Sequence, residues 1–372
     1  MVYGLDFIRR FETFCPLWLA EEGDPVGLHI GDLNRDIKRI MMTLDVRPEV
    51  VAEAIEKKVD LIIAKHPPIF RPVKRLTPDT PQNKMYLDLI KHEIAVYAAH
   101  TNMDIMENGL NDWFCEELGI EVDHYLTKTH EVAFRKLVVY IPVEQASEMR
   151  QVLGDAGAGE QGNYHHTSYS MTGIGRFTPT KDAQPTIGSA EQAEEVMEER
   201  IEVIYPETIE SQVLSAMLKA HSYEEPAYDL FSLNNAPKTY GVGRVGNLKE
   251  AITMDALVEK VKTQFNLTGL RLIEPRKPKE KVQRIAICGG SGEKFYPDAL
   301  KQQADVYITG DVYYHTAHDM QAAGLAVIDP GHHIETLCVP KFVEIMEGWK
   351  QSEAWDVEII PSMTNTNPFQ NR

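Results

Sequence analysis

The sequence predicts an α/β protein with a mainly parallel sheet, interrupted by an inserted α+β domain. Three observations lead to this prediction. Short apolar strands alternate with helices at both ends of the chain, as they do in parallel sheets. Between these segments the order is strand, helix, two strands, helix and strand, which is typical of ferredoxin-like domains. The chain has 372 residues, and at roughly 150 residues a domain this length allows two or three domains.

Residues 1–126 form the first part of the predicted α/β domain. Apolar residues at helical spacing predict helices over residues 3–15, 48–58, 84–92 and 108–118. Asn108 is the expected cap of the last helix. Short apolar runs predict strands over residues 37–44, 59–64 and 94–99.

Residues 127–236 form the predicted insert, because the character of the sequence changes near His124. We expect its strands over residues 135–142, 200–205 and 227–233. We expect its helices over residues 144–155, 192–199 and 207–220. A glycine-rich loop over residues 157–188 and a return linker over residues 234–246 complete it.

Residues 237–372 complete the α/β domain, because strands and helices alternate again. We expect a helix over residues 254–265 and strands over residues 283–288, 304–309 and 325–329. A last helix is expected over residues 334–349, interrupted near Pro340.

Composition excludes some kinds of partner. Lysine and arginine total 38 and aspartate and glutamate 56, which gives a net charge of −18. We therefore expect neither nucleic acid nor a membrane as partner, since both bind positively charged surfaces. We see no leader and no run of 18 apolar residues. The four scattered cysteines are expected to be buried thiols, and we expect a cytoplasmic protein.

Polar residues follow five of the predicted strands. His66 follows the second strand of the chain, and His100 and Asp104 follow the third. In the last segment, the positions after strands hold the GGSG sequence of residues 289–292, then Asp311, then the pair His332 and His333. Ligands of open parallel sheets bind beyond the carboxyl ends of the strands. The combination therefore predicts a metal or active-site cluster.

The spacing of these residues suits a metal site. His100 and Asp104 lie four residues apart, and His332 and Glu335 lie three apart. Each pair shares one face if a helical turn begins there. Imidazole with carboxylate suits zinc, iron or manganese. Without the histidines, Glu335 would be interpreted as a capping or solvent-facing carboxylate.

Two further features have more than one interpretation. The GGSG sequence, which includes Gly289, Gly290 and Ser291, could cradle a phosphate or form only a tight turn. His315 follows Asp311 in a predicted helix. It could orient the ligands, contact substrate or face solvent.

Six motifs occur together in order: GDPVGLHIGD, IIAKHPPIF, HTNMDIMENGLND, ICGGSGEKF, ITGDVYYHTAHD and IDPGHHIE. They resemble those of the Nif-three-like dinuclear metal-centre family, whose members are often labelled GTP cyclohydrolase I type 2 homologs. The insert, through GNYHHTSYS, GIGRFTP and HSYEEPAYDL, resembles the PII- or CutA-like domain of the longer bacterial members. The resemblance covers nearly the whole chain.

The resemblance implies a two-lobed α/β domain that carries two divalent metal ions, zinc or iron first and manganese as a further option. The ligands it implies are His66, His100, Asp104, His332 and Glu335. It also implies a homohexamer, a trimer of dimers whose openings are capped by the inserts.

Lys65 departs from the family pattern, in which many members have two metal-binding histidines before the proline. Lysine binds metal only as the neutral amine, which requires loss of a proton. One metal would then be weaker or absent. Alternatively, Lys65 faces the substrate and offsets its negative charge. The three-residue spacing of His332 and Glu335 also differs from the four-residue spacing of shorter members.

The leading hypothesis is a metal-dependent hydrolase that acts on a nucleotide-like small molecule, with Asp104 or Glu335 bridging the ions or acting as base. Gly289, Gly290, Ser291, Asp311 and His315 are its candidate substrate contacts. A second hypothesis is a non-enzymatic, metal-containing scaffold or small-molecule sensor that works through the insert. A third is metal storage or delivery.

Overall fold

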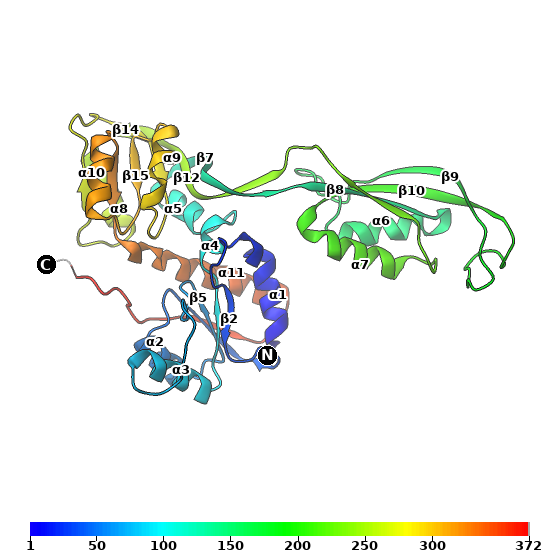
Figure 1. The fold of residues 1–372 in the computed structure, drawn as a ribbon. Coiled ribbons are helices and arrows are strands. Elements are labelled where there is room, and N and C mark those ends of the chain that lie inside the picture. The colour runs from blue at the N-terminus through cyan, green and yellow to red at the C-terminus, as the bar shows by residue number, and fades with distance from the viewer. Residues whose placement is uncertain (371–372) are drawn as a thin grey trace. The chain divides into compact units, whose positions relative to one another are not determined.

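The computed structural model describes residues 1–370, and the chain falls into two units (Figure 1). Unit 1 combines residues 1–129 with the chain from Tyr240 onward, and unit 2 comprises residues 130–239. Within residues 1–370, no helix is long and apolar enough to cross a membrane. All four cysteines are buried free thiols, as predicted.

The first sheet of unit 1 has five strands in the order β17-β4-β5-β6-β2. β17, β4, β5 and β6 run parallel, and β2 is antiparallel to β6. The strands are β2 (Gly27–Ile30), β4 (Arg39–Thr43), β5 (Leu61–Ala64), β6 (Ala95–Ala98) and β17 (Glu358–Pro361). β5 and β6 are buried along their whole length, because helices cover both faces of the sheet.

Four helices cover this sheet. One face packs against α2 and α3, and the other against α1 and α11. Their bounds are α1 (Gly4–Phe14), α2 (Pro48–Glu56), α3 (Pro81–Lys91) and α11 (Cys338–Ser352). Phe11 of α1 stacks on Phe342 of α11 with ring centroids 5.4 Å apart. Each such fully buried side chain stabilises the fold by about 1.5–3 kcal/mol. Three short elements lie nearby: β1 (Val2–Tyr3), β3 (Asp36–Ile37) and η1 (Leu17–Leu19).

The second sheet of unit 1 has six strands in the order β13-β16-β15-β14-β12-β7. Its central strands β14, β15 and β16 are parallel, whereas β12 and β13 pair antiparallel to their neighbours β14 and β16. The strands are β7 (Ile120–Val132), β12 (Lys238–Ile252), β13 (Arg271–Ile273), β14 (Val282–Ile287), β15 (Val306–Ile308) and β16 (Ala326–Asp329). The accompanying helices are α8 (Met254–Gln264), η4 (Glu293–Phe295), α9 (Tyr296–Lys301) and α10 (Tyr314–Ala322).

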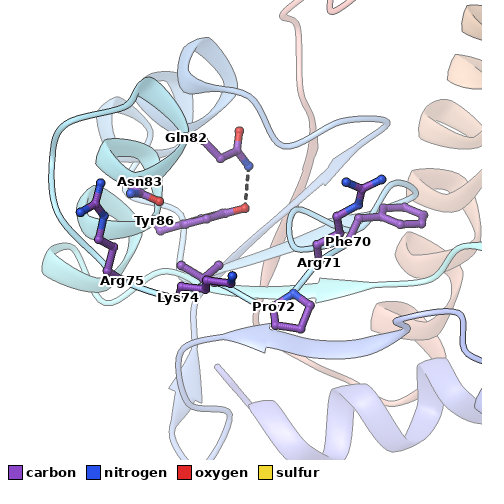
Figure 2. A pocket seen from close by; sticks show the side chains of 9 residues that line it. Phe70, Arg71, Pro72, Lys74, Arg75, Gln82, Asn83 and Tyr86 are labelled. Atoms are coloured by element: carbon purple, nitrogen blue, oxygen red, sulfur yellow. Dashed lines mark hydrogen bonds between the residues drawn. The ribbon is translucent and has the colours of Figure 1, made fainter.

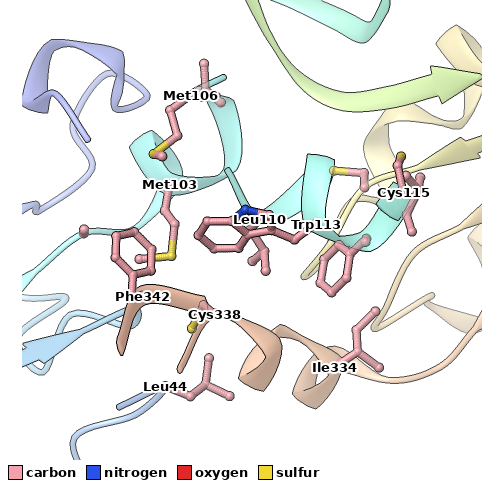
Figure 3. Close-up of a cluster of buried hydrophobic side chains, with 14 of the residues drawn as sticks. Leu44, Met103, Met106, Leu110, Trp113, Cys115, Ile334, Cys338 and Phe342 are labelled. Atoms are coloured by element: carbon pink, nitrogen blue, oxygen red, sulfur yellow. The ribbon is translucent and has the colours of Figure 1, made fainter. Parts of the chain in front are cut away.

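A cluster of buried side chains joins the elements that lie between the two sheets (Figure 3). These elements are α4 (Thr101–Ile105), α5 (Leu110–Leu118), η5 (His332–Leu337) and α11. Leu44, Met103, Trp113, Cys338 and Phe342 belong to the cluster, and the Trp113 and Phe342 rings lie 5.3 Å apart. Met103 adjoins Asp104, and Ile334 of the same cluster adjoins Glu335, so their packing fixes the backbone from which these candidate ligands project.

Unit 2 is a four-stranded antiparallel sheet with two helices on one face (Figure 1). Its elements in chain order are β8 (Phe134–Pro142), η2 (Val143–Gln145), α6 (Ala146–Asp155), β9 (Tyr169–Phe177), β10 (Glu194–Pro206), η3 (Glu207–Ile209), α7 (Glu210–Ala220) and β11 (Tyr228–Ser232). The strand order is β11-β8-β10-β9, and the succession of strand, helix, two strands, helix and strand is the one predicted from the sequence. Both helices bury their apolar side chains against β8 and β10.

Three predictions for the insert and its linker are wrong. The segment 157–188 is not wholly a loop, because β9 lies within it. The charged segment 192–199 is not a helix, because most of it belongs to β10, where Glu195 pairs with Arg176 of β9. The segment 234–246 is not a linker, because β12 begins at Lys238. Its glycines allow neighbouring strands to approach closely. A Cβ on Gly246 would lie 2.1 Å from the Glu121 carbonyl oxygen.

Two helix ends also differ from the prediction. α11 is not interrupted at Pro340, because the helix begins at Cys338 and the proline lies in its first turn. α5 is capped by Gly109 rather than Asn108, and the Gly109 N–H donates to the Asp112 carboxylate over 3.2 Å.

Candidate metal centre

Three of the five predicted ligands meet at one point: His66, which follows β5, and His332 and Glu335 of η5. Glu335 Oε2 lies 2.9 Å from His66 Nε2 and 3.2 Å from His332 Nε2, and the two Nε2 atoms are 3.3 Å apart. Ligands about 2.0–2.1 Å from a tetrahedral ion are about 3.3 Å from one another. The three atoms therefore have the separations of ligands that share one metal ion.

The short helix η5 explains why the spacing of His332 and Glu335 works. A 3₁₀ helix has three residues per turn, so residues three apart project from the same side. His332 and Glu335 therefore project toward the same point from η5.

Both histidines are oriented by carboxylates. His66 Nδ1–H donates to Asp45 Oδ1 over 2.7 Å, and His332 Nδ1–H donates to Asp311 Oδ2 over 2.7 Å. Burial raises the pKa of Asp45 and Asp311, but the bonds from the histidines outweigh it, so the pKa of each carboxyl lies below its ordinary value. A carboxylate on Nδ1 fixes the ring and leaves Nε2 for a metal.

The carboxylate of Glu335 favours positive charge in the space that it shares with His66 and His332. Its hydrogen bond raises the pKa of His332 to about 9, although burial opposes that shift. Burial raises the pKa of Glu335 itself, but Lys65 and the two histidines hold it well below the ordinary value. A buried carboxylate that faces two imidazoles stabilises protons or a cation there, and a metal ion releases such protons when it binds.

His100 lies beside this group. It precedes α4, and its ring centroid is 5.8 Å from that of His66. His100 Nδ1–H donates to Asp24 Oδ1 over 2.8 Å, while Asp24 Oδ2 accepts from the Thr101 N–H over 3.0 Å. Burial raises the pKa of Asp24, but the bonds from His100 and Thr101 outweigh it and lower the pKa to about 2. His100 is therefore oriented as His66 and His332 are.

Lys65 and Asp104 form a buried ion pair next to Glu335. Lys65 is 1% exposed, and its Nζ lies 2.9 Å from Asp104 Oδ2 and 3.7 Å from Glu335 Oε1. Burial lowers the pKa of Lys65, but the charges of Asp104 and Glu335 outweigh it and raise the pKa above its ordinary value. Asp104 Oδ1 is buried and has no hydrogen-bond partner among residues 1–370.

The glycine loop after β14 allows Glu335 to approach. Gly290 has φ +62°, and a Cβ on it would lie 2.8 Å from Glu335 Oε1 and 3.5 Å from His332 Nε2. Only glycine suits both the backbone conformation and the space. Ser291 donates to Asp311 over 2.7 Å, so the loop also supports the carboxylate that orients His332.

Contact of this loop with a phosphate stays a prediction. Two of its N–H groups already have partners: Gly289 donates to Asn111 Oδ1 and Gly292 to Thr309 Oγ1, each over 3.0 Å. The candidate substrate contact His315 lies on α10, with its ring against Tyr313 and Tyr314. Both tyrosines are exposed, at 61% and 69%. A role for His315 in substrate binding also stays a prediction.

A basic hollow, drawn in Figure 2, is lined in part by Phe70, which contacts His100. It has a volume of about 460 Å³, and its lining residues are Phe70, Arg71, Pro72, Val73, Lys74, Arg75, Gln82, Asn83 and Tyr86. Phe70 is 60% exposed, and its ring lies edge-on to His100 at 5.4 Å. Tyr86 anchors the loop, because its hydroxyl donates to the Pro68 carbonyl over 2.6 Å. The basic cluster FRPVKR was visible in the sequence but was not singled out.

Sequence reasoning also missed the carboxylates Asp24 and Asp45. Asp45 lies two residues after the end of β4, so the rule that selected residues at strand ends could have found it. Asp24 lies in a loop before β2, and the motif GDPVGLHIGD was the only sequence signal for it. Asp311, by contrast, was singled out as a substrate contact, and the structure places it against His332.

The chain matches known proteins along its whole length. A family model described as Duf34/NIF3 (NGG1p interacting factor 3) matches residues 3–368. A Bacillus subtilis protein named "GTP cyclohydrolase 1 type 2 homolog" is 42% identical over 368 residues, which are 99% of this chain and 98% of the relative.

Two solved structures are also similar to nearly the whole chain. A Bacillus cereus protein related to NIF3 is 40% identical, with a TM-score of 0.91 over 99% of both chains. A Staphylococcus aureus protein is 27% identical, with a TM-score of 0.76 over 100% of this chain and 99% of the other. The resemblance inferred from the six motifs is thereby confirmed, and the chain belongs to the Duf34/NIF3 family.

Proposed function

We propose that this protein is a metal-dependent hydrolase whose ion is held by His66, His332 and Glu335, with His100 beside it. The observation that carries the proposal is the triangle of Nε2, Nε2 and Oε2 atoms with edges of 2.9, 3.2 and 3.3 Å. The orientation of all three histidines by carboxylates supports it, because metal-binding histidines are typically held this way.

Zinc or iron suits this donor set best, and manganese is a further option, because imidazole and carboxylate bind all three. A bound divalent ion would lower the pKa of a water molecule and polarise the group under attack. The chain's own residues hold the ligands in place and keep Glu335 ionised. Because Glu335 faces both histidines, we assign it to ligation rather than to general-base catalysis.

The proposed substrate is a nucleotide-like anion. The hollow beside His100 presents Arg71, Lys74 and Arg75 on a chain whose net charge is −18, and such local positive charge suits phosphate groups. Phe70 adds an exposed aromatic face between the hollow and the centre. A relative's name, "GTP cyclohydrolase 1 type 2 homolog", is in keeping with a substrate of this class.

The test measures hydrolysis of nucleoside triphosphates, GTP included, by metal-free protein and by protein loaded with zinc, iron or manganese. We expect turnover only with metal, and its loss in His66→Ala and His332→Ala. His92→Ala is the matched control, since His92 is exposed and lies outside the centre. Full activity of the metal-free protein, or of both site variants, would contradict the proposal.

The substrate assignment has a separate test. Arg71→Ala and Lys74→Ala should each raise KM about tenfold with little change in kcat, because they remove charge that binds the substrate before the reaction. Lys91→Ala, an exposed lysine on α3, is the control. An unchanged KM in both hollow variants would exclude the hollow as the anion site.

We also propose self-association, as the homohexamer implied by the resemblance requires. Unit 2 exposes apolar side chains along β9 and β10, among them Met171, Ile174 and Met197, at 47%, 50% and 53%. Ile174 and Met197 face each other in the register of the two strands. Light scattering should show a hexamer that Ile174→Glu dissociates, and a monomeric wild type would contradict the proposal.

A further inference from the structure

We propose that the ammonium group of Lys65 takes the place of a second cation in this centre, so that each chain binds one divalent ion. The inference rests on the proposed metal centre and deepens it, because it fixes the number of ions. The pattern that the sequence resembles has two ions and a histidine at this position. Here the position holds a lysine.

The position of the ammonium group carries the argument. Lys65 Nζ lies 2.9 Å from Asp104 Oδ2 and 3.7 Å from Glu335 Oε1. Asp104 comes from α4 and Glu335 from η5, so the ammonium lies between carboxylates from two separate segments. Both carboxylates belong to the ligand set that the resemblance implies. The lysine therefore occupies the place where a cation shared by these two groups would lie.

Glu335 divides its two oxygens between the histidine pair and Lys65. Oε2 faces the Nε2 atoms of His66 and His332, and Oε1 faces Lys65. When a carboxylate bridges two metal ions, each of its oxygens likewise binds one of them. In this chain one side of the bridge is a metal position and the other is an ammonium group.

A second ion shared by Asp104 Oδ2 and Glu335 Oε1 does not fit beside the ammonium. A divalent ion on Asp104 Oδ2 would lie about 2.0–2.2 Å from that oxygen, whereas Lys65 Nζ already lies 2.9 Å from it. The ammonium has three donors and no lone pair, so it repels the ion rather than binding it. Repulsion between like charges is strong in buried surroundings.

Burial also decides between the two roles that the sequence left open for Lys65. A lysine that contacts the substrate must reach the surface of the site, but Lys65 is 1% exposed and its ammonium is bonded to Asp104. Arg71 and Lys74, which line the open hollow, are placed to meet an anion instead. Lys65 therefore acts inside the centre.

The test is elemental analysis of the full-length protein after equilibration with excess zinc and removal of unbound metal. We expect one ion per chain in the wild type and two in Lys65→His, in which the imidazole supplies a ligand. Lys91→His adds a histidine at an exposed position and should stay at one ion. His66→Ala should lose the wild-type ion.

The outcomes separate this inference from the proposed function. Two ions in the wild type, or one in a folded Lys65→His variant, would overturn the inference and leave the metal centre standing. A wild type that binds none would contradict the centre itself, and the inference with it.

If Lys65→His does not fold, a measurement on the wild type alone still tests the number of ions. Loaded with manganese, the wild type should give the electron paramagnetic resonance spectrum of isolated Mn²⁺. The spectrum of an exchange-coupled pair would overturn the inference, because two ions would then share the centre.

Discussion

Asp45→Asn tests whether the carboxylates around the centre tune its metal affinity. Asp45 Oδ1 accepts a hydrogen bond from His66 Nδ1 over 2.7 Å, and Asp45 Oδ2 accepts one from the Thr366 hydroxyl. Asparagine has nearly the same shape and keeps an oxygen acceptor for His66. The substitution therefore removes the negative charge while it preserves the orientation of the ring.

The surroundings of Asp45 set the expected loss of metal affinity. Loss of a partner that orients a metal-binding histidine typically weakens metal binding by about 10- to 100-fold. The Asp45 side chain is 25% exposed, so water already screens part of its charge. Asparagine also keeps the ring in place. We therefore expect the low end, about tenfold, which corresponds to about 1.4 kcal/mol of binding free energy.

The assay is competition for zinc between the protein and a chelator of known affinity. Asp45→Asn should raise the zinc Kd about tenfold, and Asp45→Ala should raise it further because the ring is then free to turn. Thr366→Val leaves the carboxylate on His66 and should change the Kd less than either. If Asp45→Asn, folded as the wild type is, binds zinc equally tightly, then Asp45 does not tune His66 and the reasoning is refuted.

Three further predictions concern stability and the shape of the centre. Arg244 is buried and holds Asp112 with bonds of 2.6 and 2.7 Å, so Arg244→Met should lower the free energy of unfolding by about 3–5 kcal/mol in urea titration; a loss below about 1 kcal/mol would contradict this. Gly290→Ala should abolish stoichiometric zinc binding, because the new Cβ would lie 2.8 Å from Glu335 Oε1; retention of the metal at wild-type affinity would show that the loop yields. Burial raises the pKa of Glu53, but its bonds to Lys57 and to the chain after β17 outweigh this and lower the pKa from 4.5 to about 2. Its stabilisation is therefore complete above about pH 4.5 and is lost as the pH falls through about 2. Glu53→Gln should cost about 2 kcal/mol at pH 7, after allowance for solvent screening, and little once the pH is below about 2; a cost that persists at low pH would refute the assignment.

The strands of the parallel sheets could be predicted from the sequence because their signal is local. Residues 61–64 and 95–98 are short apolar runs between helical segments, and each is buried along its length. Helix starts and strand ends followed the same local rules within a few residues. The segments 192–199 and 234–246 could not be predicted in this way, because pairing with β9 and β14 outweighs their charged and glycine-rich composition.

The candidate ligands were also visible in the sequence. His66 and His332 follow apolar strands, and the carboxyl ends of parallel strands meet at one edge of a sheet. Glu335 could be added from its spacing to His332, because helical spacing places side chains on one face. These inferences needed only the chain order and the periodicity of secondary structure.

Local sequence patterns were enough to predict which residue types gather at the candidate centre, since strand ends and helical turns have local signals. Their charge states and partners depend on the folded chain. Folding brought Asp24 and Asp45 onto histidines 76 and 21 residues away, and it buried Lys65 against Asp104, 39 residues on. The charge state and the partner of a buried group depend on which distant atoms exclude water from it, and that arrangement exists only once the chain has folded.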